Sequence, residues 1–308
     1  QMSGSVMIAP RESPGGVRIV LLGATGQLGQ EIVRLSSREF LPPALVLLPL
    51  TRSQLDMAHF ERDSSVSSTR SLMASADIIV NCAAYTAVDR AEIEPELATA
   101  VNETGVRLLA QFAAAHDQLF IHISTDFVFG GELSRAYTET DMATPVNHYG
   151  RSKLGGERAI QEVAARWIIL RSSWLFGSYG HNFMQTIRKG VLAQRPLRIV
   201  ADQLGSPTPA SDLARTVLQF CTMSAAGIPC SGLWHYGGTP AASWYGLARA
   251  IAETMLKSGE VERLPPIEPI ASEDWPAAAI RPRNSVLDCH KIAAEFGIAP
   301  PDWRGRCL

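Results

Sequence analysis

Short apolar runs alternate with segments of helical apolar spacing between Val17 and Ser172, and this alternation constrains the fold more than any other feature. The runs are VRIVLLG, ALVLLPL, DIIVN, LFIHIST and RWIILRSS. They are almost continuously apolar, which is typical of strands buried on both faces of a sheet. Segments between them, such as PELATAVNETGVRLLAQFAAAHD, have the apolar spacing of helices. The pattern predicts an α/β fold with a doubly wound parallel sheet of the Rossmann type.

The pattern changes after residue 173. Short segments there mix with Pro and Gly, and two helical segments stand out, SDLARTVLQFCTM and SWYGLARAIAETMLKSG. We expect a smaller mixed α/β domain over 174–308, discontinuous in sequence, that forms a substrate pocket against the first domain. The first domain spans 17–173 and is completed by part of 211–237. Residues 1–16 are small, polar and rich in Pro and Gly, without the apolar core of a signal peptide, and we expect a disordered extension.

Composition narrows the classes of partner. The net charge is −2, which indicates no basic face for nucleic acid or an anionic membrane. No apolar run approaches the roughly 18 residues of a membrane-spanning helix. The five cysteines are scattered without a C-x-x-C pair, so we expect a reducing cytoplasm, no disulfide framework and no metal site.

A glycine-rich turn, GATGQLG, follows the first apolar run and opens a helix. Gly23 is expected to let the strand turn tightly, Gly26 to let a pyrophosphate approach the backbone, and Gly29 to let the helix pack on the sheet. Glycines after a strand also occur in ordinary turns, but the strand–turn–helix context favours dinucleotide binding. The candidate cofactor-binding residues of this turn are Gly23, Thr25, Gly26, Gln27, Leu28 and Gly29.

The second apolar run ends without the acidic residue that usually binds the ribose 2′-hydroxyl. Thr51 and Arg52 stand there instead. Arg52 suits a 2′-phosphate, which favours NADPH over NADH; the alternative is a solvated loop arginine. Asp56 follows, either to bind the adenine amino group or as a turn aspartate. We therefore expect 17–173 to be an NAD(P)-binding domain.

Tyr149 and Lys153 lie four residues apart in HYGRSKLGGE, a spacing that puts both side chains on one face of a helix. The run LFIHIST upstream ends in Ser124 and Thr125, at the sheet edge where doubly wound folds bind ligands. A nearby ammonium is expected to lower the tyrosine pKa from its usual value of about 10, so that the hydroxyl can donate a proton. Alone, the pair could be two unrelated residues on a solvated helix. With Thr125 and the glycine turn it becomes a candidate catalytic trio of Thr125, Tyr149 and Lys153.

Together these motifs resemble the extended short-chain dehydrogenase/reductases, and more specifically the dTDP-4-dehydrorhamnose reductase family. From Val17 almost to the C-terminus the chain contains, in the family's order, GATGQLG, IIVNCAAYTAVDRAE, HISTDFVFGG, HYGRSKLGGE, LRSSWLFG, NFMQTI, VADQLGSPT and IRPRNSVLD. The resemblance implies NAD(P)H-dependent reduction of the 4-keto group of dTDP-4-dehydro-L-rhamnose to dTDP-L-rhamnose, for cell-wall or surface polysaccharide. Tyr149 would donate a proton to the keto oxygen, and Lys153 would also bond the nicotinamide ribose.

The resemblance also assigns residues around the cofactor and the sugar nucleotide. Ala83 and Ala84 would line the cofactor's path past the sheet edge. The candidate substrate-binding residues are Val88, Asp89, Ser124, Asp126, Phe127, Trp174, Asn182, Phe183 and Arg281. An arginine suits a diphosphate, although Arg281 could also be a surface charge. Trp174 and Phe183 could instead belong to the core, and Asp126 to a turn.

Two departures from the family limit what the resemblance implies. Phe127 stands where the family usually has tyrosine, which removes a hydroxyl near the sugar. Glu31 occupies a position at which some members bind magnesium at a dimer contact, but SPTPASDLAR supplies no clear second carboxylate. We therefore predict no metal, and the sequence leaves a homodimer open.

Other functions are compatible with the same motifs. One is a non-catalytic regulatory subunit like the β subunit of methionine adenosyltransferase, which resembles this family. Another is a reductase or epimerase of a different sugar nucleotide. Dehydration is not expected, because Asp126 is followed by Phe127 and not by the glutamate that dehydratases use as an extra acid–base group.

Overall fold

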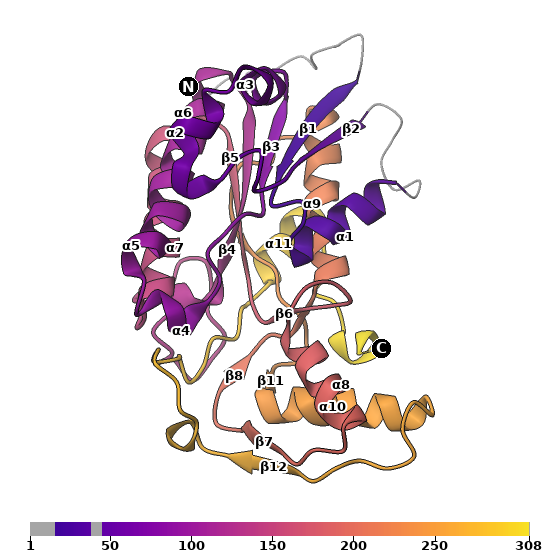
Figure 1. The fold of residues 1–308 in the computed structure, drawn as a ribbon. Coiled ribbons are helices and arrows are strands. Elements are labelled where there is room, and N and C mark those ends of the chain that lie inside the picture. The colour runs from indigo at the N-terminus through magenta and orange to yellow at the C-terminus, as the bar shows by residue number, and fades with distance from the viewer. Residues whose placement is uncertain (1–15, 38–44, 308) are drawn as a thin grey trace.

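The computed structural model describes residues 16–37 and 45–307, so the extension expected over 1–16 lies almost wholly outside the described residues. Six strands form the central sheet in the order β10–β5–β4–β3–β1–β2, and all neighbours run parallel (Figure 1). The strands are β1 (Val17–Leu22), β2 (Leu45–Leu50), β3 (Ile78–Asn81), β4 (Leu119–Thr125), β5 (Trp167–Ser172) and β10 (Gly232–His235). The predicted doubly wound parallel sheet is confirmed.

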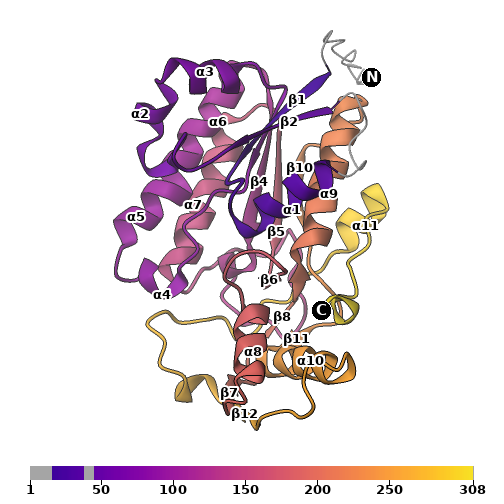
Figure 2. The same ribbon diagram turned by 45° about the vertical axis from the view of Figure 1, so that its right-hand side comes forward.

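Helices cover both faces of this sheet (Figure 2). One face carries α1 (Gln27–Ser36), α9 (Ala210–Ala225) and α11 (His290–Phe296). The other carries α2 (Phe60–Ser64), α3 (Ser67–Ala74), α5 (Pro95–Thr99), α6 (Gly105–Ala115) and α7 (His148–Val163). Successive side chains of a strand point to opposite faces. In β1, Ile19 and Leu21 therefore pack in the core under α1 and α9, while Val20 and Leu22 pack in the core under α6.

A smaller layer lies beyond the carboxyl ends of the strands, at the bottom of Figure 1. Its helices α8 (Phe183–Leu192) and α10 (Trp244–Lys257) pack together, and β7 (Leu197–Val200) pairs with β12 (Ile267–Ile270). Short strand pairs join β8 (Leu204–Gly205) to β11 (Ala242–Ser243) and β6 (Leu175–Phe176) to β9 (Thr208–Pro209). The chain returns to the large sheet through α9 and β10 between these segments. None of the helices in the described part of the chain is long and apolar enough to cross a membrane.

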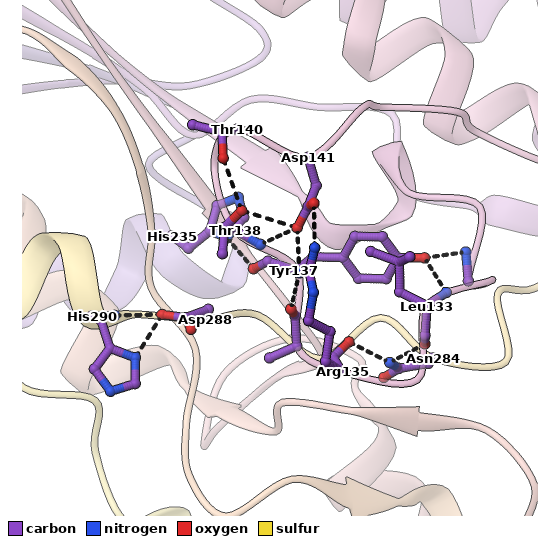
Figure 3. Close-up of polar contacts among 12 residues, drawn as sticks. Leu133, Arg135, Tyr137, Thr138, Thr140, Asp141, His235, Asn284, Asp288 and His290 are labelled. Atoms are coloured by element: carbon purple, nitrogen blue, oxygen red, sulfur yellow. Dashed lines mark hydrogen bonds and ion pairs between the residues drawn. The ribbon is translucent and has the colours of Figure 1, made fainter.

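The loop from β4 to α7 is tied to a segment near the C-terminus (Figure 3). The hydroxyl of Tyr137 accepts hydrogen bonds from the backbone of Gly131 and Leu133, at 3.0 and 3.2 Å. The amide nitrogen of Asn284 donates to the carbonyl oxygens of Leu133 and Arg135, both at 2.8 Å. These bonds order the connection between the strand that ends in a threonine and the helix that carries the Tyr–Lys pair.

Candidate active site

The glycine-rich turn lies between the ends of β1 and β3. Gly23 has a φ of +74°, and an added Cβ would lie 2.7 Å from the backbone nitrogen of Ala83. An added Cβ on Gly29 would overlap the carbonyl oxygen of Gly23. At Gly26, the N-cap of α1, an added Cβ would meet only that carbonyl, at 3.2 Å. Two of the glycines therefore permit close packing, and the third leaves the helix N-terminus open to an anion.

The remaining turn residues differ in what they can offer a ligand. Thr25 is exposed, whereas Leu28 is buried in the core, so only its backbone can face a cofactor. The amide nitrogen of Gln27 is buried and has no hydrogen-bond partner among the described residues. A buried donor without a partner is costly, and a ligand oxygen at this turn would satisfy it.

Arg52 and Asp56, after β2, contact each other. The side chain of Arg52 is 76% exposed, and its Nε lies 3.0 Å from Asp56 Oδ2. The other carboxylate oxygen of Asp56 accepts from the backbone of Ala58 at 3.0 Å and caps a short 3-10 turn, Met57–His59. Asp56 thus has the local role of a turn aspartate, while Arg52 extends into solvent beside the carboxyl end of β2.

Thr125 and Tyr149 meet at the carboxyl edge of the sheet. Thr125 ends β4, and Asn147 caps α7 by accepting from the backbone of Gly150 at 2.8 Å, so the helix begins immediately before Tyr149. The Tyr149 hydroxyl lies near that of Thr125, which favours the phenolate, yet burial raises the pKa of Tyr149 to about 12. Phe127 packs edge-on against Tyr149, with ring centroids 5.8 Å apart. The expected lowering of the tyrosine pKa is wrong here, because the effect of burial outweighs that of the nearby Thr125 hydroxyl.

Lys153 does not lower that pKa because it makes other contacts. Its side chain is buried, Nζ donates to the carbonyl oxygen of Ile123 at 2.6 Å, and Nζ lies 3.2 Å from Nε2 of His122. Burial lowers the pKa of Lys153 to about 8. Thr125, Tyr149 and Lys153 are therefore neighbours, as the spacing requires, but the lysine faces the strand.

Two residues expected at the sugar are hydrogen-bonded within the protein. Asp126 is 2% exposed, accepts from Thr125 Oγ1 at 3.1 Å and from Ser173 Oγ at 3.0 Å, and has its pKa raised to about 6 by burial. Ser124 donates to Glu157, which forms a buried ion pair with Arg171. Ser124 and Asp126 thus contact α7, Thr125 and Ser173 within the protein, and their contact with the sugar stays a prediction.

Asp89 and Arg281 are brought together from distant parts of the chain. Arg281 Nη2 lies 2.7 Å from Asp89 Oδ2, and Nη1 donates to Oδ1 at 3.1 Å. The guanidinium holds the pKa of Asp89 below its usual value. Asp89 lies in α4 (Val88–Ala91), whose first residue, Val88, is half-buried. The ion pair therefore holds α4 against the C-terminal loop that contains Arg281. Asn182 has a capping role, since it accepts from the backbone at the start of α8 and donates to loop carbonyls.

A cavity of about 450 Å³ lies in the smaller layer. Phe183 and Trp244 form an aromatic wall with ring centroids 4.7 Å apart, and Trp174 stacks on Trp244 at 3.5 Å. Trp174 has a φ of +45°, an unusual backbone conformation for a bulky residue. The cavity is lined by Phe183, Arg198, Ile199, Val200, Gln203, Trp244, Ser272, Glu273, Trp275, Ala277, Ala279, Ile280, Arg281 and Arg283. Aromatic faces and three guanidinium groups suit a ligand with a flat ring and phosphates.

Several residues at or near the site could not be identified from the sequence. Trp244 begins α10, and a tryptophan at a helix start is equally typical of a core residue. Arg198 and Arg283 lie in unremarkable strand and loop positions. Asn102 sits in a π-helical turn, Ala100–Thr104, and its amide bonds the backbone of Tyr85 and the hydroxyl of Ser152. A π-turn inside a helix depends on such packing and is not visible in the apolar spacing.

The described residues contain no group of three or more His, Cys, Asp or Glu side chains placed to hold a metal ion. Glu31 is 4% exposed and forms an ion pair with Arg34 at 2.7 Å. Its carboxylate is therefore already neutralised within its own helix.

The chain is similar to known proteins along almost its whole length. Residues 17–307 match the family described as the RmlD substrate binding domain. The dTDP-4-dehydrorhamnose reductase of Aggregatibacter actinomycetemcomitans is 38% identical over 288 residues, which cover 93% of this chain and 96% of the relative. The chain belongs to the dTDP-4-dehydrorhamnose reductase family. The resemblance read from the motifs is confirmed.

Two further members of the dTDP-4-dehydrorhamnose reductase family are similarly close. The Escherichia coli K12 reductase is 35% identical over 290 residues, covering 94% of this chain and 95% of the relative. The crystal structure of the Bacillus anthracis reductase in complex with NADP superposes with a TM-score of 0.83 at 30% identity, covering 95% of this chain and 97% of that one. Both the sequence and the fold are thus similar to those of these reductases along nearly the whole chain.

Proposed function

We propose that this chain reduces the 4-keto group of dTDP-4-dehydro-L-rhamnose to give dTDP-L-rhamnose, at the expense of NADPH or NADH. The observation that carries the proposal is the placement of Thr125, Tyr149 and Lys153 together at the same sheet edge as the glycine-rich turn. The curated relatives carry the name of this activity, and the Bacillus anthracis relative was crystallised with NADP.

The residues of the turn fit a dinucleotide. The open side of Gly26 and the unpartnered amide of Gln27 offer donors to a pyrophosphate at the N-terminus of α1. The exposed guanidinium of Arg52 can reach a 2′-phosphate, which favours NADPH without excluding NADH. When bound, the nicotinamide supplies the hydride.

The chain's own side chains hold the substrate and supply the proton. Tyr149 donates its proton to the 4-keto oxygen while the Thr125 hydroxyl holds that oxygen in place. Lys153 would hold the nicotinamide ribose. We assign the nucleotide end of the substrate to the cavity, where Arg281 meets the diphosphate and Trp244 the base.

The proposal also covers the domains, the cellular location and the oligomeric state of the protein. We propose that 17–173 with part of 211–237 binds the cofactor, that the rest of 174–308 binds the sugar nucleotide, and that the protein acts in the cytoplasm. A homodimer stays a prediction, which the mass of the protein in solution tests. The alternatives are a non-catalytic regulatory subunit and an enzyme acting on another sugar nucleotide.

The test is cofactor oxidation with a panel of nucleotide-linked 4-keto sugars. The dTDP-linked rhamnose precursor should be the preferred substrate, and Tyr149→Phe should lower kcat by roughly 10²–10⁴-fold with cofactor affinity unchanged. Tyr245→Phe, at a half-buried position of α10 where the hydroxyl accepts a hydrogen bond from Arg249, is the matched control and should keep full activity. Bound cofactor without turnover of any panel member would favour the regulatory alternative. A near-normal rate in Tyr149→Phe would refute the proton-donor role.

A further inference from the structure

A chain of three buried side chains runs behind the candidate site. Asn81 ends β3, His122 lies in β4, and Lys153 lies in α7; their exposures are 0%, 0% and 2%. Asn81 Nδ2 is 3.1 Å from His122 Nδ1, and His122 Nε2 is 3.2 Å from Lys153 Nζ. The hydrogen atoms in this chain must be shared consistently, because none of the three groups reaches solvent.

The direction of the chain is set by a backbone amide. The N–H of Ala83 donates to Asn81 Oδ1 at 3.0 Å, and a backbone amide can only donate. The side-chain amide of Asn81 therefore cannot be turned round, and its nitrogen faces His122. Nδ1 of His122 must accept that hydrogen bond, so a neutral imidazole carries its proton on Nε2.

The proton on Nε2 then points at Lys153. An ammonium group has three donors and no lone pair, so it would place donor against donor. A neutral amine can accept from Nε2–H and still donate to the carbonyl oxygen of Ile123 at 2.6 Å. All hydrogen bonds of the chain are satisfied together only when Lys153 is neutral.

We propose that Asn81 and His122 are positioning residues that hold Lys153 against β4 and favour its neutral amine form. Lys153 can take a proton from water and become an ammonium once it leaves His122, or once the His122 proton moves to Nδ1 and the bond from Asn81 is lost. The pair thus couples the charge of Lys153 to its position. Its effect on catalysis rests on the proposed function, but the hydrogen-bond polarity does not.

The titratable groups around Lys153 are compatible with this assignment. Glu157, on the same helix, favours the ammonium, but Arg171 already neutralises it in a buried ion pair. Cys82, after β3, is a neutral thiol because burial raises its pKa to about 12. Burial lowers the pKa of Lys153 to about 8 and that of His122 well below its ordinary value, and the charge of Lys153 lowers the pKa of His122 further.

Asn81→Asp reverses the polarity of the chain with almost no change of shape. A carboxylate accepts both from the Ala83 amide and from His122 Nδ1, so the imidazole proton moves to Nδ1 and Nε2 becomes an acceptor for an ammonium. The pKa of Lys153 should rise by about one unit or more. Under the proposed function, the alkaline limb of the kcat/KM pH profile should move upward by the same amount.

The direct test is the tautomer of His122 at a pH above the Lys153 pKa of about 8, read from long-range ¹H–¹⁵N correlations of the full chain with ¹⁵N-labelled histidine. We expect the Nε2–H form in the wild type and the Nδ1–H form in Asn81→Asp, with His122→Gln providing the assignment. His235 is an internal reference of opposite polarity, because its Nδ1 lies 3.0 Å from the carbonyl oxygen of Tyr137 and must donate (Figure 3). An Nδ1–H tautomer or an imidazolium for His122 in the wild type would overturn the proposal.

A second measurement keeps the test independent of both catalysis and the variant. The chain has only four lysines, Lys153, Lys189, Lys257 and Lys291, so the ¹³Cε resonances of labelled lysine can be titrated individually. Lys153 should lose its proton at a clearly lower pH than the other three. A Lys153 titration at their pH would overturn the proposal even if Asn81→Asp fails to fold, and neither measurement needs the sugar nucleotide.

Discussion

Replacing Asp126 with Asn should make the fold more stable at neutral pH. Asp126 is 2% exposed, and burial raises its pKa from the ordinary 3.8 to about 6, although the hydroxyl groups of Thr125 and Ser173 donate to it. A carboxyl group with a higher pKa in the folded state destabilises that state once it is ionised. The shift of about two units corresponds to about 3 kcal/mol at pH 7, at about 1.4 kcal/mol per unit. The penalty falls with pH, to about 1.5 kcal/mol near pH 5, because the folded-state carboxyl is then mostly protonated.

The assay is urea unfolding of the wild type and Asp126→Asn at pH 7 and pH 5. The variant should be more stable by about 3 kcal/mol at the higher pH and by about half of that at the lower. Asp141→Asn is the matched control, since Arg135 and the Thr138 backbone hold the pKa of that carboxyl well below its usual range. This control should lose stability at neutral pH, with the loss shrinking under acid conditions. If Asp126→Asn is no more stable at pH 7, or its gain does not depend on pH, the assignment of Asp126 as a buried carboxyl of raised pKa is wrong.

Two further substitutions test the packing around the site. Gly29→Ala should abolish dinucleotide binding measured by calorimetry, because the new Cβ would overlap a carbonyl oxygen of the turn; Gly305→Ala, with open space around it, should bind normally. Glu157→Gln should cost about 3–5 kcal/mol of unfolding free energy, because the charge of Arg171 is left buried and unpaired. In contrast, Glu162→Gln at an exposed ion pair should cost less than about 1 kcal/mol. Equal losses in the two glutamate variants would contradict the structural argument.

Much of the large domain could be predicted because its signals are local. Apolar runs such as the one ending at Leu22 are visible as strands, and Gly23 marks the turn since no other residue fits its backbone there. Tyr149 and Lys153 share a helix face through their spacing alone. The family could be assigned from motifs for the same reason, because each motif is a short continuous stretch of the chain.

The contacts made by those residues could not be predicted in this way. The spacing of Lys153 indicated a lysine beside Tyr149, but the ammonium or amine lies against Ile123 and His122, which belong to another strand. Asp126 looked like a ligand contact or a turn residue, whereas the structure buries it behind Thr125. Arg281 pairs with Asp89 across 192 positions of sequence, a contact that no local pattern records.

By itself, the sequence determined the alternation of strands and helices, the glycine turn, the candidate trio and the family, because each depends on neighbours along the chain. Tertiary structure alone decided the charge states. Burial sets the pKa of Tyr149, Lys153 and Asp126, and burial is a property of what packs around a group from every side. The tertiary structure also decided which side chains face a ligand and which are hydrogen-bonded to one another, because the elements that meet at the site come from both ends of the chain.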